Sequence, residues 1–527
     1  MDASGWLLFI VLVQIIHGLG TWKLYTKAGK KAWEAFVPVY NAMVLMKIIN
    51  RPTWWTLLLF IPIINLFMFP IVWIETLRTF NKKSTTDMIL GVVTCGLYIA
   101  YVNYTQEVVY HANRDLKAPT KAIDTAGSLA FAIIVATFVH TYFIQPYTIP
   151  TSSLEKSLLV GDFLFVSKFH YGARTPMTPI AAPMVHDSLP VVHTKSYTTW
   201  PQLPYFRFPG FRKIERNDIV VFNWPTDTLY NMYKAADKRY DKPIDKKTNY
   251  VKRCVAIPGD SLQIKNGILF INGKESILPE RAKPQYSYKV SWDGKTPVNL
   301  DYLEKELDIT DTYGQIAKDT LFFSALPMQS VERLKNVPGI TSVTRVISNG
   351  AEDGIFPDFG DRKPSISNDW NKDNMGPIYI PEAGKTVKLD SKSLPFYKKI
   401  ISEYEGNDLK VNGNEIRING QIVTDYTFKQ NYYWMMGDNR HNSLDARYFG
   451  YTPENHIVGT PVFIWMSIDG INNGIKNWKI RWDRLFTTVN GKGQPQSYFQ
   501  YFLVLLAIYF VGDYFWKKKK KEKELNK

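Results

Sequence analysis

Three segments far apart in the chain carry side chains that together could hydrolyse an acyl bond. Thr151 and Ser153 lie in a short hydroxyl-rich turn, Lys252 lies in an apolar stretch, and Ser443 lies in a run of turn-forming residues, 437–447. A serine hydroxyl becomes a strong nucleophile only when a neighbouring base accepts its proton. A lysine can be that base near neutral pH if burial lowers its pKa. These residue types therefore indicate a serine–lysine hydrolase.

The neighbours of Lys252 decide whether its side chain is buried. Most of residues 250–257 are apolar, which is typical of a buried strand on which the pKa of a lysine would fall. Arg253 beside it predicts that one face of the same strand contacts water. The ordinary alternative for Lys252 is a solvent-exposed lysine at a strand edge.

Residues 437–447 (GDNRHNSLDAR) combine turn-forming residues with groups that could support a lysine. Ser443 could hydrogen-bond the lysine and orient it, while Asp445 and Arg447 lie on the same side of an extended chain and could form a charge pair. A plain loop is the alternative. An EF-hand is excluded because its glycine and closing glutamate are absent, and residues 369–373 fail the same test and are expected to form a surface loop. We expect no metal ion and no cofactor.

Four blocks of this chain resemble, in order and spacing, those of the bacterial type I signal peptidases (leader peptidases). That family consists of membrane-bound serine–lysine endopeptidases that remove signal peptides from exported proteins. The blocks are residues 149–174, 216–225 (RNDIVVFNWP), 250–260 (YVKRCVAIPGD) and 433–454 (YWMMGDNRHNSLDARYFGYTPE). The resemblance covers roughly residues 146–469, with a large insertion.

The resemblance implies a role for each matching residue. Ser153 would be the nucleophile, and Lys252 would be the general base that forms and then hydrolyses an acyl-enzyme. Ser443 would orient the lysine, and Asp445 with Arg447 would support the loop.

The resemblance also implies an oxyanion hole. In the family it combines the backbone N–H of the nucleophile with a hydroxyl two residues earlier, which here are Ser153 and Thr151. After the nucleophile the family usually has methionine and then a Pro-Thr pair, whereas this chain has LEKS at residues 154–157. The wall of the substrate pocket therefore departs from the family pattern.

This departure creates a second candidate base. Ser153 and Lys156 spell S-x-x-K, the nucleophile motif of penicillin-binding-type serine hydrolases, although the S-D-N and K-T-G motifs of those enzymes are absent. Their S-x-x-K opens a helix, whereas Pro150 and the strand-like residues 158–166 predict an extended chain in which Lys156 points away. A further alternative is a non-catalytic membrane-anchored binding or assembly factor with a peptidase-like groove.

Charge and hydrophobicity favour a membrane partner over nucleic acid. The formal net charge is +16, but residues 517–527 contain seven lysines and two glutamates directly after an apolar stretch. That pattern is typical of a tail on anionic lipid. Cys95 lies in an apolar span and Cys254 in a predicted strand beyond the membrane, so we expect no disulfide.

Five apolar stretches approach the length of about 20 residues that crosses a bilayer. They are residues 6–22, 54–74, 88–102, 126–144 and 498–516. Lysines follow the first stretch, which lacks the basic start of a cleaved signal peptide, so the positive-inside rule places the N-terminus outside. The basic loop 75–87 conflicts with simple alternation, and Pro62 and Pro70 would allow a broken segment there.

These expectations define a location and partners. The chain would be a multi-pass protein of the bacterial inner membrane, with its catalytic domain on the periplasmic side and its C-terminus in the cytoplasm. Signal peptides of exported precursors would bind as an extended strand along residues 149–153. Aromatic residues near 146–147 and 200–211 would contact membrane lipid, and the secretion machinery would be a further partner.

Beyond the fourth span, the residue pattern predicts a mainly antiparallel β catalytic domain of signal-peptidase type with an inserted subdomain, flanked by transmembrane helices. Predicted strands include residues 158–160, 163–166, 219–222, 251–257 and 458–466. The predicted domains are a multi-span region 1–125, an anchor 126–146, catalytic parts 147–260 and 432–497, an insertion 261–431, a transmembrane helix 498–516 and a basic tail 517–527.

Overall fold

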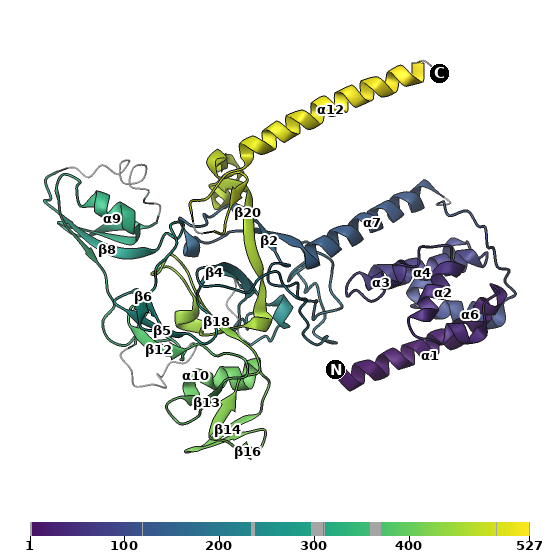
Figure 1. Ribbon diagram of the computed structural model, residues 1–527, viewed down its shortest axis with the longest axis horizontal. Helices are drawn as coiled ribbons and strands as arrows, with labels where there is room; N and C mark the ends of the chain where they lie inside the picture. The colour runs from purple at the N-terminus through teal and green to yellow at the C-terminus, as the bar shows by residue number, and fades with distance from the viewer. Residues whose placement is uncertain are drawn as a thin grey trace. The chain divides into compact units, whose positions relative to one another are not determined.

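The computed structural model describes residues 3–117, 120–232, 238–296, 309, 311–358, 370–491 and 493–525. It divides into two compact units. The first contains Met1–Phe143, Ala173–Phe208 and Tyr240–Lys247, and the second contains Ile144–Gly172, Pro209–Arg239 and Thr248–Lys527. Figure 1 labels the helices and strands of both units along the chain.

The first unit is mainly helical. Its helices are α1 (Ala3–Lys27), η1 (Ala32–Ala35), α2 (Tyr40–Ile48), α3 (Trp55–Leu58), α4 (Asn65–Thr79), α5 (Thr85–Val93), α6 (Leu97–Thr105), α7 (Lys121–Tyr142) and η3 (Ile244–Lys246). Ser84 accepts a hydrogen bond from the backbone N–H of Asp87 and caps α5, and Thr120 caps α7 in the same way. Apolar side chains from α1, η1, α2, α3, α4, α6 and α7 form one continuous core.

Three helices in the described part of the chain are long and apolar enough to cross a membrane: Ser4–Lys27, Lys121–Tyr142 and Phe499–Lys519. The predicted stretches 54–74 and 88–102 are not single helices. The first is interrupted between α3 and α4, where Pro62 lacks an N–H and Ile63 has a φ of 68°, and the second is interrupted at Cys95, with a φ of 51°. Because an α-helix requires negative φ at every residue, the predicted spans end at these positions.

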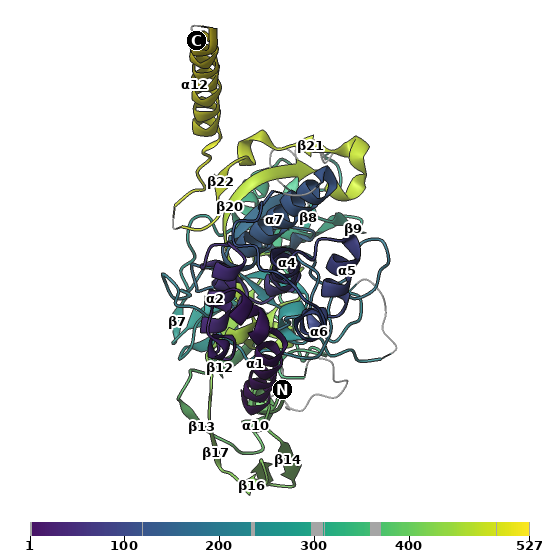
Figure 2. The same cartoon turned by 90° about the vertical axis from the view of Figure 1, so that its right-hand side faces the viewer.

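The second unit is built on an antiparallel sheet that curls into a half-barrel, and the predicted mainly β fold is confirmed. The strand order is β1-β2-β20-β3-β4-β18-β19, and β21 and β22 also pair with β20. Figure 2 labels β20, β21 and β22. The strands are β1 (Ile144–Thr148), β2 (Asp162–Ser167), β3 (Ile219–Asn223), β4 (Asn249–Ala256), β18 (Tyr432–Met436), β19 (Thr452–Pro453), β20 (Ile457–Asp469), β21 (Lys479–Ile480) and β22 (Thr487–Thr488).

Four of the strands predicted in this domain are confirmed as β2, β3, β4 and β20. The strand predicted at residues 158–160 is wrong. Its residues form a turn in which Leu159 N–H donates to the Asp162 carboxylate at 2.8 Å, and Gly161 has a φ of 89°. Leu158 is apolar because it enters the core beneath the sheet rather than because it extends a strand.

Between β4 and β18 the chain adds four smaller sheets. They contain β12-β5-β6-β7, β11-β8-β10-β9, β13-β17 and β14-β15-β16. The strands are β5 (Ser261–Lys265), β6 (Ile268–Ile271), β7 (Lys274–Glu275), β8 (Gln285–Trp292), β9 (Tyr313–Ala317), β10 (Thr320–Pro327), β11 (Ile340–Arg345), β12 (Met375–Tyr379), β13 (Thr386–Lys388), β14 (Leu409–Asn412), β15 (Glu415–Ile418), β16 (Gln421–Ile422) and β17 (Asp425–Thr427).

These added sheets contribute to two different cores. The sheet of β8 to β11 and helix α9 (Met328–Leu334) enclose a core of their own. Apolar side chains of β5, β6, β12 and of residues 389–428, including α10 (Leu394–Lys399) and η4 (Ile400–Tyr404), join the core of the main sheet. The predicted domain boundaries, including 261–431 for the insertion, remain a prediction.

The remaining helices of the second unit are short, except the last. They are η2 (Ser152–Leu154), α11 (Ala446–Phe449), η5 (Glu454–His456), η6 (Ile471–Asn473), η7 (Ile475–Asn477), η8 (Trp482–Arg484) and α12 (Phe499–Leu525). Helix α12 is the third apolar helix, and its lysine-rich end agrees with the pattern of the sequence.

Candidate active site

Ser153 lies in the single turn of 3₁₀-helix η2, directly after the chain leaves the main sheet. Leu154 next to it is almost fully buried in the small core formed by β2, β3 and β20, together with Ile149 before the turn. These two apolar anchors fix the turn from both sides. The Ser153 residue itself is 9% exposed, so its hydroxyl lies at the edge of a largely dry site.

Lys252 lies on β4, between β3 and β18 in the main sheet. Its Nζ is 2.5 Å from Ser153 Oγ, and the two atoms share a hydrogen bond. The residue is 5% exposed, and burial lowers its pKa from 10.5 to about 8, while the negative charge of Asp445 opposes the shift. The structure therefore joins a serine and a readily deprotonated lysine that are 99 residues apart.

Lys156 does not have the helical relation to Ser153 that the S-x-x-K motif requires. Helix η2 ends at Leu154, Glu155 has a φ of −46° and a ψ of 148°, and Lys156 has a left-handed φ of 69°. A serine and a lysine three residues apart share a face only when the chain between them is helical. The geometry favours Lys252 over Lys156 as the partner of the serine.

The loop that follows β18 holds the backbone of the serine. The N–H of Asn439 donates to the carbonyl of Ser153 at 3.1 Å, and its side-chain amide donates to the carbonyl of Ser152 at 3.3 Å. A Cβ at Gly437 would collide with the Ser153 carbonyl oxygen and with the Ser443 hydroxyl, so only glycine fits. The loop and the segment around Ser153 are thus packed backbone to backbone.

Ser443 lies beside Gly437, where the loop contacts the backbone of Ser153. Its Oγ is buried and makes no hydrogen bond in the described part of the chain, including none to Lys252. A hydroxyl in that state retains both a donor and an acceptor for a partner. The orienting role of Ser443 stays a prediction.

Thr151 is exposed and lies two residues before Ser153. Its backbone is extended, with a φ of −133° and a ψ of 156°, and its side chain does not cap η2. The hydroxyl is therefore not consumed by the helix that follows it. Its part in an oxyanion hole stays a prediction.

Asp445 and Arg447 form a fully buried ion pair. The guanidinium donates through Nε and Nη2 to the two carboxylate oxygens at 2.9 and 2.8 Å, and Asp445 also accepts the N–H of Gly437 at 3.1 Å. Burial alone would raise the pKa of Asp445, but the charge and hydrogen bonds of Arg447 hold it below its usual value. The pair connects α11 to the start of the loop.

A second buried ion pair was not recognised in the sequence. Arg253 donates to both oxygens of Asp438 at 2.8 and 2.6 Å, and Ser157 Oγ donates to the same carboxylate at 2.5 Å. The prediction that Arg253 marks a wet face of the strand is wrong, because the residue is 1% exposed. The only sequence feature that indicated a partner for Arg253 is the aspartate of the GDN turn, Asp438.

Gln285, at the start of β8, also contacts this loop. Its N–H donates to the carbonyl of Asp438 and its carbonyl accepts from Arg440, both at 2.9 Å, while its side chain donates to the carbonyl of Glu155 at 2.9 Å. The sheet that contains β8 thereby connects the loop to the turn that carries Ser153. No local sequence signal distinguishes this glutamine from a surface residue.

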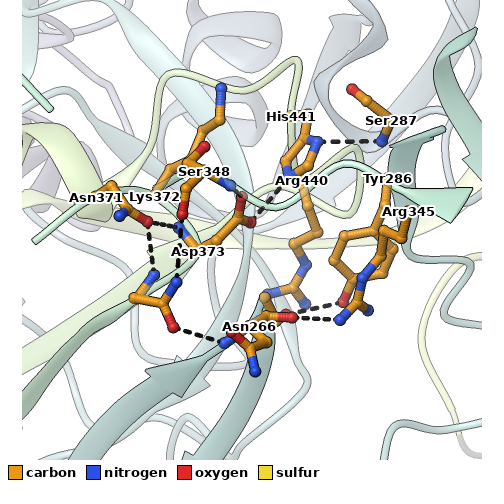
Figure 3. A network of polar contacts seen from close by, with 12 residues as sticks. Asn266, Tyr286, Ser287, Arg345, Ser348, Asn371, Lys372, Asp373, Arg440 and His441 are labelled. Carbon is orange, nitrogen blue, oxygen red and sulfur yellow. Dashed lines mark hydrogen bonds and ion pairs between the residues drawn. The ribbon is translucent and has the colours of Figure 1, made fainter. Parts of the chain in front are cut away.

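Figure 3 shows how His441 extends these contacts into the insertion. Its Nδ1 accepts the N–H of Ser287 at 3.1 Å, so the proton lies on Nε2, which is 2.8 Å from Asp373. Asp373 also accepts the N–H of Ser348 at 2.8 Å and is 2% exposed. The prediction that residues 369–373 form a surface loop is therefore wrong for Asn371 and Asp373, which are buried, and Asp369 lies outside the described residues.

The assembled groups have the chemistry of covalent hydrolysis. A buried amine can take the proton of Ser153, while paired charges on both sides hold the loop in one geometry. Within the described residues, no group of three His, Cys, Asp or Glu side chains is arranged to hold a metal ion.

Two protein-family models match the chain. One is described as signal peptidase, peptidase S26, and matches residues 122–325 and 383–466. The other is described as a family of unknown function and matches residues 33–113. The first match includes all the candidate site residues.

Curated relatives agree with the first of these matches. A signal peptidase I of Buchnera aphidicola subsp. Baizongia pistaciae is 22% identical over 366 residues, which cover 69% of this chain and 82% of the relative. A signal peptidase I of Helicobacter pylori (strain J99) is 23% identical over 375 residues, which cover 68% of this chain and 90% of the relative.

Proposed function

The chain belongs to the peptidase S26 family of signal peptidases, and on that premise we propose that it cleaves signal peptides by a serine–lysine mechanism. The family and its relatives support the removal of signal peptides. The observation that carries the proposed mechanism is the 2.5 Å hydrogen bond between Ser153 Oγ and Lys252 Nζ.

In the acylation step, Ser153 Oγ attacks the carbonyl carbon of the scissile peptide bond, and neutral Lys252 accepts the hydroxyl proton. The tetrahedral oxyanion accepts hydrogen bonds from the Ser153 N–H and the Thr151 hydroxyl. When the C–N bond breaks, protonated Lys252 donates its proton to the leaving amine. The signal peptide remains as an ester of Ser153.

In the deacylation step, Lys252 is neutral again and accepts a proton from a water molecule that attacks the ester. The same two donors stabilise the second oxyanion, and the proton returns from Lys252 to Ser153 Oγ as the ester bond breaks. Ser443, whose hydroxyl is buried and has no hydrogen-bond partner among the described residues, would hold the amine in position through both steps.

Precursors would bind with the cleavage region extended along residues 149–153. Pro150 and Thr151 are exposed there, which supports access of a strand to the main chain beside the nucleophile. Small side chains at the first and third residues before the cut are implied by the family resemblance.

The relatives and the three apolar helices are consistent with a protein of the inner membrane. We further propose that the catalytic unit lies on the periplasmic side and the lysine-rich C-terminus in the cytoplasm. Exposed aromatic residues at Trp200, Phe206 and Phe211 support contact of this region with lipid, and the secretion machinery would deliver substrates nearby.

The proposal is tested with the full chain in lipid vesicles and an exported precursor as substrate. The Ser153→Ala variant is expected to lose cleavage by about 10⁴-fold or more, while the matched Ser152→Ala variant keeps it. Mass spectrometry of the products identifies the bond that is cut. Cleavage by Ser153→Ala would reject the nucleophile, and precursor binding without cleavage by the unaltered protein would favour the non-catalytic alternative.

A further inference from the structure

The first unit contains a buried glutamate surrounded by three arginines that the proposed peptidase mechanism does not use. Glu75 lies in the last turns of α4 and is 4% exposed. Arg51 and Arg78 each donate to its carboxylate at 2.8 Å, and Arg114 donates to the same group. We call these four residues the Glu75 cluster.

The Glu75 cluster carries more positive than negative charge. Three guanidinium groups, which stay protonated in proteins, face one carboxylate, so the formal charge is +2. The Arg114 side chain is only 4% exposed, yet its Nε and Nη1 atoms are buried without a hydrogen-bond partner among the described residues. Buried charged donors are costly to leave unpaired. The cluster therefore lacks acceptor atoms.

Main-chain carbonyls supply only part of the missing acceptors. Arg114 Nη2 donates to the carbonyl of Ile49 at 3.1 Å, and Arg78 Nη2 donates to the carbonyl of Lys117 at 3.0 Å. Ile49 ends α2, where the helix dipole adds partial negative charge. These bonds use other atoms than Arg114 Nε and Nη1, which still need a partner.

Hydrogen bonds between main-chain segments place the three arginines on one side of the unit. The N–H of His111 donates to the carbonyl of Thr79 at 3.1 Å, and the Tyr110 hydroxyl donates to the carbonyl of Ile48 at 3.4 Å. The ends of α2 and α4 and the segment before α7 therefore meet. Simple alternation of five spans would put the loop of Arg78 on the side opposite to the loops of Arg51 and Arg114. In the structure these three loops lie together.

We propose that the Glu75 cluster binds the phosphate group of an anionic phospholipid where the helices of this unit reach the membrane surface. A phosphate group offers several acceptor oxygens, and planar guanidinium groups bind it through paired hydrogen bonds. Its negative charge offsets the excess positive charge of the cluster.

Two observations favour a lipid headgroup as the source of that phosphate. The side chains of Arg51 and Arg78 are 23% and 13% exposed, so the cluster opens to the surface through them. Arg51 also lies 5.3 Å above the ring of Trp55, a residue type enriched at membrane interfaces. Basic pockets between membrane helices are established sites for lipid headgroups.

The test uses the full chain in phosphatidylcholine micelles titrated with phosphatidylglycerol. Native mass spectrometry counts bound lipid, and the unfolding temperature reports stabilisation. The unaltered protein is expected to retain phosphatidylglycerol and to unfold at a higher temperature with it. The Arg114→Gln variant is expected to bind it at least about tenfold more weakly, because it loses charged hydrogen bonds. Arg51→Gln is expected to weaken binding less.

Lys83→Gln is the matched control, since it removes one exposed positive charge outside the cluster and is expected to change affinity by less than about twofold. An equal loss in this control would show diffuse surface attraction and overturn the proposal. So would equal retention of both lipids by the unaltered protein, or displacement of phosphatidylglycerol by inorganic phosphate at the same concentration, which would assign the site to a free anion. If Arg114→Gln does not fold, Arg51→Gln decides, and unchanged binding in it overturns the proposal.

Discussion

Both structural units bury carboxylates against arginines, but they balance the charges differently. We call the second unit, which contains Ser153 and Lys252, the catalytic unit, and the first unit, which contains Glu75, the membrane unit. Around the active-site loop, Asp438 faces Arg253 and Asp445 faces Arg447, one guanidinium for each carboxylate. In the membrane unit, Glu75 faces three arginines. One arginine for each carboxylate balances the charge and holds the loop in place. Three arginines around one carboxylate leave a positive charge and hydrogen-bond donors that an anionic ligand could pair with.

The comparison also explains the state of Lys252. The two carboxylates of the loop are already occupied by arginines, and no carboxylate lies within ion-pair distance of Lys252 in the described residues. Burial lowers the pKa of the lysine to about 8, although the negative charges of Asp445 and Asp438 oppose the shift. The loop carboxylates are thus paired with arginines rather than with the lysine, which suits the base role proposed for Lys252.

The largest expected effect on activity comes from replacing Lys252, which belongs to neither of the two buried ion pairs. Replacement of Lys252 by methionine keeps the buried volume but removes the base, so kcat/KM for precursor cleavage is expected to fall by about 10⁴-fold or more. Lys156→Met is the matched control and is expected to retain activity. Loss of activity in Lys156→Met alone would assign the base to the S-x-x-K motif.

The next effect breaks a matched pair. Asp438→Asn leaves Arg253 buried without a carboxylate and is expected to lower the free energy of unfolding by about 3 to 5 kcal/mol, measured by urea denaturation in detergent. Asp408→Asn, in an exposed pair with Lys410, is expected to cost less than about 1 kcal/mol. Equal losses in both variants would mean that burial does not strengthen the loop pairs.

A smaller effect on the rate is expected from removing the hydroxyl of Thr151, which takes part in neither of the buried ion pairs nor in the Glu75 cluster. Thr151→Val removes the proposed oxyanion donor while keeping the shape, and kcat is expected to fall by about 100-fold. Thr151→Ser restores a hydroxyl and is expected to restore most of the rate. A kcat unchanged in Thr151→Val would exclude the threonine from the oxyanion hole.

The smallest expected effect is a gradual change of kcat/KM with pH. Because the pKa of Lys252 is lowered to about 8 and its neutral form is the proposed base, kcat/KM is expected to rise about tenfold per pH unit below 8 and to level off above it. Rates of precursor cleavage between pH 6 and 10 measure this profile. A flat profile across pH 8 would show that the titration of Lys252 does not control the reaction.

Much of the fold and of the site could be predicted because it depends on local pattern. Short apolar runs between Gly and Pro residues predicted β2, β3, β4 and β20, and the residue types together with the family resemblance singled out Ser153 and Lys252. Apolar length alone misled at residues 54–74 and 88–102, where single residues with positive φ interrupt the helices. Length and composition do not encode such breaks.

The types and order of the residues in four blocks by themselves determined the family of this protein, and they supplied the serine and the lysine of the proposed mechanism. Only the tertiary structure decided their environment. Burial depends on contacts between distant segments, so the pairing of Arg253 with Asp438, the contacts of Gln285 and the three arginines around Glu75 could not be read from neighbours in the chain. Coulombic and desolvation effects follow distance in space, and that distance exists only in the folded chain.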